Sequence, residues 1–284
     1  MAIQSTGIPK CTIKKKGQND FRTWCITEIR DDKYCFHVVS PKLLYGDRNS
    51  WVRSLHRIYT AIRGLCCVPS NLWGTRIHVA THPATSVDEL KALAKTVIHH
   101  NHGFNALAWK LQSKDIDSSA HSLVWIPDLS NLSGRRRRIL DNLDSTQSVE
   151  GIAKLMNTDR SGKGHLRPWD FWPVVDARNN AETTTYYDGY QFTNLVEYNL
   201  APGSAIAEDA IMWIDIACLF VRGALKHNAK WYGGTTKGPD PNLFRETDLS
   251  KFVLEQAEDA GLSGTEYVRI KERLAFLKEA DSEN

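Results

Sequence analysis

One apolar stretch, residues 210–221, constrains the fold more than any other feature of the sequence. Only Asp215 is charged within it, and its twelve residues are fewer than the about 20 that a helix needs to cross a bilayer. Glu208, Asp215 and Arg222 recur every seven residues and form one narrow polar stripe, either facing solvent or paired, on a helix that is otherwise apolar. We expect a long helix at 204–228 that does not span a membrane, with the C-terminal part of the chain organised around it.

Two β-prone runs near the N-terminus predict a hairpin. They comprise residues 21–29 and 33–39 and flank the acidic turn Asp31-Asp32. After them, residues 51–65 have apolar side chains at helical spacing and arginines mostly elsewhere. This pattern predicts a basic amphipathic helix.

The next segments are typical of a βαβ unit. A short strand at 76–80 precedes Ser86-Val87-Asp88-Glu89, whose first and fourth residues form a capping box at the start of a helix. Gly103 is expected to end this helix. The apolar run 104–111 is expected to be the second strand, parallel to the first.

The C-terminal half of the chain is mainly helical in pattern. Helices are expected at 135–143 and 148–156, and an aromatic, β-prone insert is expected at 183–198. The fold class is therefore α+β, a mixed α and β protein. Its β-hairpin and βαβ region covers residues 1–130, and its helix-dominated region, built on the long helix, covers residues 131–284. The two regions form either separate domains or one continuous domain.

Composition and charge exclude few functions. With 42% hydrophobic and 24% charged residues the composition is globular, and a net charge of +3 is too small by itself to indicate nucleic-acid binding. The first residues lack the apolar stretch of a secretory signal, and the six cysteines are irregularly spaced. We therefore expect reduced thiols and an intracellular location, in the cytoplasm or the nucleus.

Several familiar site motifs are absent from the sequence. The phosphate-binding loop, the dinucleotide-binding glycine pattern and the G-x-S-x-G elbow do not occur. Paired C-x-x-C sequences, the zinc signature, are also missing. The sequence therefore predicts no cofactor and no metal ion, and it leaves the catalytic residues unknown.

Three histidines lie together in His99-His100-Asn101-His102. Imidazole is a common metal ligand, but the expected helix end at Gly103 favours another role. A cationic side chain in the last turn interacts well with the final backbone carbonyl groups. The position therefore favours capping of the helix, with metal binding and catalysis as alternatives.

Two basic segments indicate a polyanionic partner. Four consecutive arginines begin an expected helix, where they oppose the helix dipole and where phosphate would relieve their mutual repulsion. The second segment interleaves cations with aromatic residues, which suits single-stranded nucleic acid, although a core edge, a protein interface or a small-molecule pocket would also explain it. The expected nucleic-acid-binding residues are Arg135, Arg136, Arg137, Arg138, Arg160, Lys163, Arg167, Trp169 and Trp172.

The first functional hypothesis is a non-enzymatic, nucleic-acid-associated structural or assembly protein, nucleoprotein-like or matrix-like, that self-associates as a homo-oligomer. Residues 1–67 hold 12 Lys and Arg against 5 Asp and Glu, whereas residues 245–284 hold 6 against 10. This asymmetry is compatible with head-to-tail association or with a polyanion at the N-terminal part, and also with a plain solvated surface.

Two other hypotheses stay open. One is an enzyme that pairs a histidine with a carboxylate, and the other is a protein-binding adaptor that uses exposed tryptophans. The candidate residues of the enzyme are His78, His82, His100 and His165 with Asp170, Asp176 and Asp215.

Overall fold

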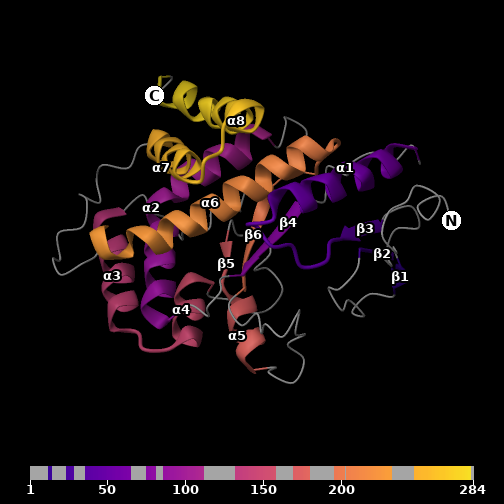
Figure 1. Ribbon diagram of the computed structural model, residues 1–284. Helices are drawn as coiled ribbons and strands as arrows, with labels where there is room; N and C mark the ends of the chain where they lie inside the picture. Colours follow the sequence, from indigo (N-terminus) through magenta and orange to yellow (C-terminus); the bar gives the residue numbers. More distant parts are fainter. Residues whose placement is uncertain are drawn as a thin grey trace. The chain divides into compact units, whose positions relative to one another are not determined.

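The computed structural model describes residues 12–14, 24–28, 36–64, 75–80, 86–111, 132–157, 169–179, 195–201, 203–231 and 246–282. In chain order (Figure 1) the elements are β1 (Thr12–Lys14), β2 (Cys25–Glu28), β3 (Phe36–Val39), α1 (Arg48–Gly64), β4 (Thr75–Ala80), α2 (Val87–Leu111), α3 (Leu132–Ser145), α4 (Val149–Met156), β5 (Trp169–Asp170), α5 (Trp172–Asn179), β6 (Leu195–Ala201), α6 (Ala207–Trp231), α7 (Glu246–Asp259) and α8 (Gly264–Ser282). Helices predominate over two small sheets in the described part, which confirms the α+β class.

The chain divides into two compact units. Unit 1 consists of Met1–Pro69, Thr183–Gln191 and Ser204–Ile211, and unit 2 consists of Ser70–Glu182, Phe192–Gly203 and Met212–Asn284. This division differs from the expected regions 1–130 and 131–284, which stay a prediction.

Unit 1 contains the first sheet and α1. β2 lies between β1 and β3, parallel to β1 and antiparallel to β3, with Cys25 opposite Val39. The antiparallel pair is the hairpin that the sequence predicts. α1 is amphipathic as expected, since Trp51, Leu55 and Ile58 are buried at helical spacing.

Tyr59 of α1 lies close to the segment that leads into α6 within unit 1. Burial raises the pKa of Tyr59, while a hydrogen bond with the Ser204 side chain opposes the rise and the charge of Asp209 adds to it. The tyrosine therefore stays protonated at neutral pH, and its hydroxyl forms a hydrogen bond with Ser204 just before α6.

Unit 2 contains the second sheet, in which β6 lies between β4 and β5 and is antiparallel to both (Figure 1). Alternate residues of the strands are buried, namely Ile77 and Val79 on β4 and Val196 and Tyr198 on β6. Trp169 of β5 pairs with Tyr198 and is buried on the same side. Since strand side chains alternate between faces, the residues between them form a second, polar face.

The expected βαβ unit is wrong. α2 continues through Gly103 to Leu111, and β4 pairs with β6 in the antiparallel direction. Phe104 and Leu107 are buried three residues apart, so that the run 104–111 gives one helix face to the core. A short apolar run has no periodicity that separates a buried strand from a buried stretch of helix.

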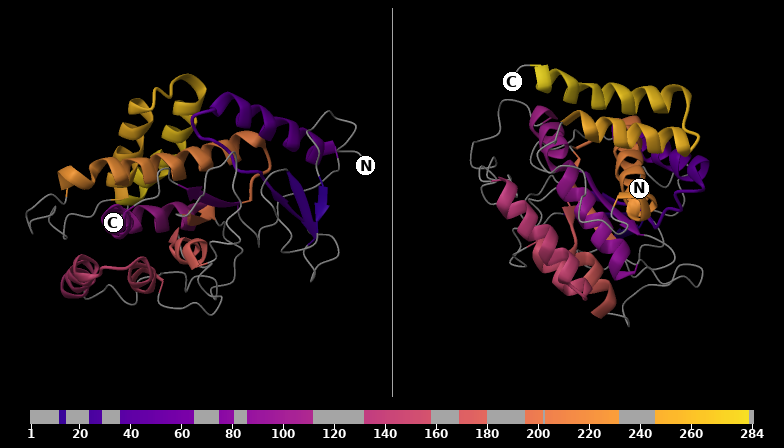
Figure 2. Two further views of the ribbon diagram at one scale, coloured as in Figure 1. Left: turned by 60° about the horizontal axis from the view of Figure 1, so that its bottom comes forward. Right: turned by 90° about the vertical axis from the view of Figure 1, so that its left-hand side faces the viewer.

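The expected long helix is confirmed as α6. From Met212 onward it belongs to unit 2, where Trp213, Ile216 and Phe220 are fully buried. α7 and α8 lie side by side and both contact α2 (Figure 2). Together with α2, α4, α5 and the second sheet, these helices enclose one hydrophobic core.

Candidate functional site

A row of polar side chains crosses the second face of the β4–β6–β5 sheet. His78 of β4 lies opposite Glu197 of β6, and Glu197 lies opposite Asp170 of β5. Directly opposed residues share one face, with their Cβ atoms about 4.5–5.5 Å apart. We call His78, Glu197 and Asp170 the polar row.

Glu197 is the buried member of the polar row. Its residue is 8% exposed, and its Oε1 lies 3.7 Å from Arg76 Nε and 3.8 Å from His78 Nε2. Both distances are too long for a hydrogen bond, and Oε1 accepts none from any described residue. The side chains of Arg76 and His78 are 45% and 48% exposed. A buried carboxylate oxygen therefore lies beside a guanidinium and an imidazole that solvent can reach.

A β-bulge adjoins the polar row. The pairing of β4 with β6 shifts register between Thr75 and Ile77. Two residues of β6, Asn199 and Leu200, therefore lie opposite the single residue Arg76. The Oδ1 and Nδ2 atoms of Asn199 are both buried and have no hydrogen-bond partner in the described part of the chain. Bulges of this kind are frequent next to functional sites, where they redirect a side chain.

Asp170 is fixed at the corner between β5 and α5. Its Oδ1 accepts a hydrogen bond from Trp172 N at 2.9 Å. The fully buried Asn157 holds the same corner, since its Nδ2 donates to Trp169 O at 3.1 Å. Its Oδ1 accepts from Phe171 N at 2.9 Å, and its backbone oxygen accepts from Trp172 Nε1 at 3.0 Å. The hydrogen bonds of Asp170 and Asn157 thus fix the Asp170 end of the polar row.

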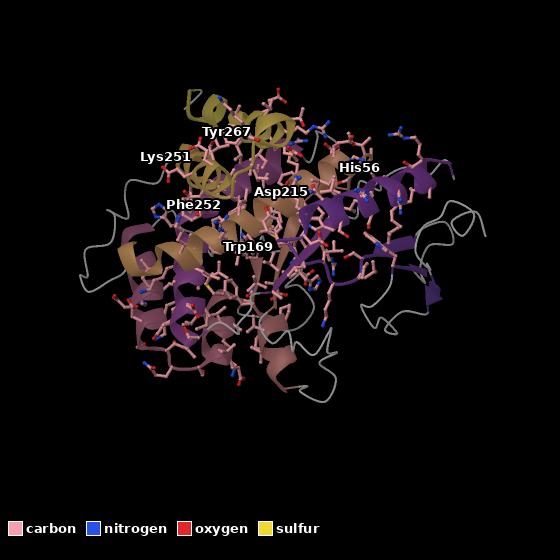
Figure 3. The ribbon with its side chains drawn as sticks, viewed as in Figure 1. His56, Trp169, Asp215, Lys251, Phe252 and Tyr267 are labelled. Carbon is pink, nitrogen blue, oxygen red and sulfur yellow. The ribbon has the colours of Figure 1, made fainter. Side chains whose placement is uncertain are left out.

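The exposed side of α1 is cationic. Its sequence contains no Asp or Glu, and its basic residues lie opposite the buried ones on the helix. Figure 3 labels one of them, His56. The exposed basic residues, which we call the cationic face of α1, are Arg53, His56, Arg57 and Arg63. None of the three arginines forms an ion pair with a residue that the structure describes.

The four-arginine run lies in α3, as expected. The first turn of this helix holds no acidic residue that would offset the positive end of the helix dipole. Arg138 is exposed, whereas the side chains of Arg135, Arg136 and Arg137 lie outside the described residues.

The second basic segment is described only at its aromatic end. Arg160, Lys163 and Arg167 lie outside the described residues. Trp169 and Trp172 are 2% and 9% exposed.

Core packing accounts for both tryptophans. The Trp169 ring stacks on Phe220 of α6, with a centroid distance of 5.2 Å, and touches Phe104 and Tyr198. Protein atoms cover these rings, and a covered ring has no free face for a base. The expectation that Trp169 and Trp172 stack on nucleic acid is therefore corrected.

The histidine cluster does not cap a helix. His100 lies inside α2 and is 5% exposed, with its ring 4.8 Å from Phe252 and 5.8 Å from Phe220 between centroids. Because α2 does not end at Gly103, the capping interpretation is wrong. His100 is a core residue.

The remaining candidates of the enzyme hypothesis fall into two groups. His82, His165 and the side chain of Asp176 lie outside the described residues. Asp215 is 1% exposed, so the polar stripe of the long helix does not face solvent there. Among the residues that the structure describes, no group of three or more His, Cys, Asp and Glu could hold a metal ion.

The structure thus brings His78 and Asp170 into one row and adds residues that sequence reasoning missed, namely Arg76, Glu197 and Asn199. The only local signal for Glu197 is a charged residue between apolar positions of a strand. Which residues lie next to it depends on the register of strands that are far apart in the chain.

In the described residues, no helix is long and apolar enough to cross a membrane. Comparison with protein families, with curated proteins and with solved structures found no match to this chain.

Proposed function

We propose that the protein binds single-stranded nucleic acid through the phosphate backbone, with the cationic face of α1 as the principal contact. The observation that carries this proposal is the exposure of Arg53, His56, Arg57 and Arg63 on one side of a helix that has no carboxylate. Guanidinium groups pair with phosphate in a bidentate manner, and this attraction does not depend on base sequence.

The arginine run of α3 supplies a second contact in this proposal. Arg138 is exposed next to Arg135, Arg136 and Arg137, and no acidic residue of the first turn competes with phosphate for them. Binding of this kind suits a nucleoprotein-like or matrix-like protein that coats a strand by self-association. In that role the protein contacts the backbone and carries out no chemistry on the strand.

The salt dependence of binding to a fluorescent oligouridylate tests the proposal. Each phosphate neutralised on a single strand contributes about −0.7 to the slope of log K against log salt. The triple variant Arg53→Gln, Arg57→Gln and Arg63→Gln should therefore make the slope about 2 less negative. Gln at positions 135–138 should make it less negative by up to about 3.

A matched control removes the same charge elsewhere. The variant Lys154→Gln, Lys251→Gln and Arg269→Gln replaces exposed residues of α4, α7 and α8 and should leave the slope near that of the wild type. If the slope became less negative by the same amount in the control and in the α1 variant, binding would depend on overall charge and not on the cationic face of α1. Absence of binding at low salt would remove the proposal altogether.

A further inference from the structure

We propose that the bulged end of the polar face is a binding site for a guanine nucleotide. Glu197 and Asn199 pair with the base, and Arg76 and His78 bind the phosphate. This inference rests on the proposed function only in taking nucleic acid as a source of the base, and free nucleotides test it separately.

β6 carries three buried polar side-chain atoms that form no hydrogen bond with a described residue. Glu197 Oε1 and Asn199 Oδ1 are acceptors, and Asn199 Nδ2 is a donor. All three are buried and form no hydrogen bond with a described residue, and Glu197 and Asn199 lie two positions apart on one strand. Among these residues, Glu197 Oε1 has only the two longer ion-pair contacts with Arg76 and His78. Buried polar atoms are almost always hydrogen-bonded, so a cluster of unpaired ones calls for a ligand that completes it.

These three atoms are complementary to the hydrogen-bonding edge of guanine. A partner that forms one hydrogen bond with each of these three atoms offers two donors and one acceptor. The Watson–Crick edge of guanine offers N1–H, N2–H and O6, which is that set. Adenine offers one donor and one acceptor there, and cytosine and uracil each offer a single donor. A site with fixed polar atoms rejects a base that leaves them unpaired.

Two basic side chains lie beside these atoms. Arg76 and His78 are the half-exposed side chains next to Glu197, and Arg76 also lies opposite Asn199 in the bulge. In the proposed complex the base takes the place of these two side chains beside Oε1, and the guanidinium and the imidazole each donate a hydrogen bond to the phosphate.

Three further buried atoms without a hydrogen bond lack this setting. Trp169 Nε1, Tyr198 Oη and Trp213 Nε1 are also buried without a partner in the described part of the chain, but they belong to the aromatic core. Burial alone raises the pKa of Tyr198, with no charged group contributing to the shift. At β6, by contrast, two acceptors and one donor without hydrogen bonds lie beside the half-exposed side chains of Arg76 and His78.

Isothermal titration of the full chain with the monophosphates of guanosine, adenosine, cytidine and uridine tests the site. We expect guanosine monophosphate to bind at one site, at least about tenfold more tightly than the other three. Guanosine should bind more weakly than its monophosphate, and Arg76→Gln should reduce that difference. Equal binding of all four nucleotides, or binding of none, overturns the inference.

The variant Glu197→Gln separates base recognition from a structural role. Xanthine carries an oxygen where guanine carries its N2 amino group, so a glutamine amide can donate to xanthine. Glu197→Gln should weaken binding of guanosine monophosphate and strengthen binding of xanthosine monophosphate. Loss of both overturns the inference. The exposed Glu150→Gln of α4 should change neither.

Comparison with strand binding keeps the two proposals distinguishable. If oligouridylate binds and guanosine monophosphate does not, the guanine site is excluded and the cationic face stands. If guanosine monophosphate binds and oligouridylate does not, the site stands and the proposed function fails. Tighter binding of an oligouridylate with one internal guanosine would assign the site to guanine within a strand, and an unchanged affinity would assign it to the free nucleotide.

Discussion

Asn157 shows how one side chain can fix a corner of the fold. Its amide satisfies the backbone oxygen of Trp169 and the backbone nitrogen of Phe171, both in a buried environment. Asn157→Ala leaves these two groups unpaired and should lower the free energy of unfolding by about 2–4 kcal/mol. Urea denaturation measures the change. The exposed Asn142→Ala of α3 is the control and should change stability by less than about 0.5 kcal/mol, so equal effects would contradict this account.

Cys218 is a thiol that the fold protects from ionisation. Burial raises its pKa from 9.0 to about 12, and the charge of Asp215 adds to the shift. The thiolate is the nucleophile, so iodoacetamide at pH 8.5 should modify Cys218 far more slowly in the native protein than in urea. Peptide mass spectrometry measures both rates, and similar rates would show that the native thiol is accessible and ionised.

The raised pKa of Cys218 also makes the free energy of unfolding depend on pH. Since the folded pKa lies above the unfolded one, the contribution of Cys218 is fully present below about pH 9 and is lost as the pH rises from 9 to about 12. Cys218→Ala should therefore make the loss of stability over this alkaline window less steep.

At the scale of elements, α6 and α7 approach each other closely at Gly223. A Cβ atom there would lie 2.7 Å from Gln256 Cγ and 2.7 Å from Phe252 Cζ. Gly223→Ala gains about 1 kcal/mol of helix propensity, but overpacking costs about 1–3 kcal/mol, so we expect a net loss of stability.

Gly64→Ala in α1 is the matched substitution, because nothing lies within 4 Å of a Cβ there. It should leave the midpoint of thermal unfolding unchanged or raise it. A stabilised Gly223→Ala variant would show that the two helices can separate without cost.

Local sequence patterns predicted where helices and strands form better than they predicted which strands pair. The capping box begins α2 as expected, since Ser86 N donates to Glu89 Oε2 at 2.7 Å and Glu89 N donates to Ser86 Oγ at 3.2 Å. The prediction that this helix ends at Gly103 is wrong, because the burial of Phe104 outweighs the low helix propensity of one glycine.

The candidate site was only partly predictable for the same reason. The sequence identifies Arg135–Arg138 and a basic helix, since clusters of charge are local. It also offers His78 and Asp170 as candidates, but their alignment with Glu197 follows from strand register, which long-range packing determines. Likewise, sequence alone does not distinguish a buried tryptophan from an exposed one.

At the scale of the molecule, the core of unit 2 should behave as one cooperative unit. Phe104 of α2 and Phe220 of α6 are in ring contact, with centroids 4.8 Å apart, and Leu93 of α2 lies in the same cluster at 2% exposure. Leu93→Ala should cost about 2–5 kcal/mol. If both helices exchange their amide hydrogens only through opening of this core, the slowest amides of α2 and α6 should speed up by the same factor, at least about tenfold.

Hydrogen exchange with mass spectrometry measures both helices in one experiment. Val268→Ala, at an exposed position of α8, is the control and should leave the rates unchanged. Faster exchange in α2 without a matching change in α6 would mean that the two helices open independently. The long apolar helix would then be stabilised by neighbours other than α2, and the aromatic contacts around Phe220 would contribute little to cooperativity.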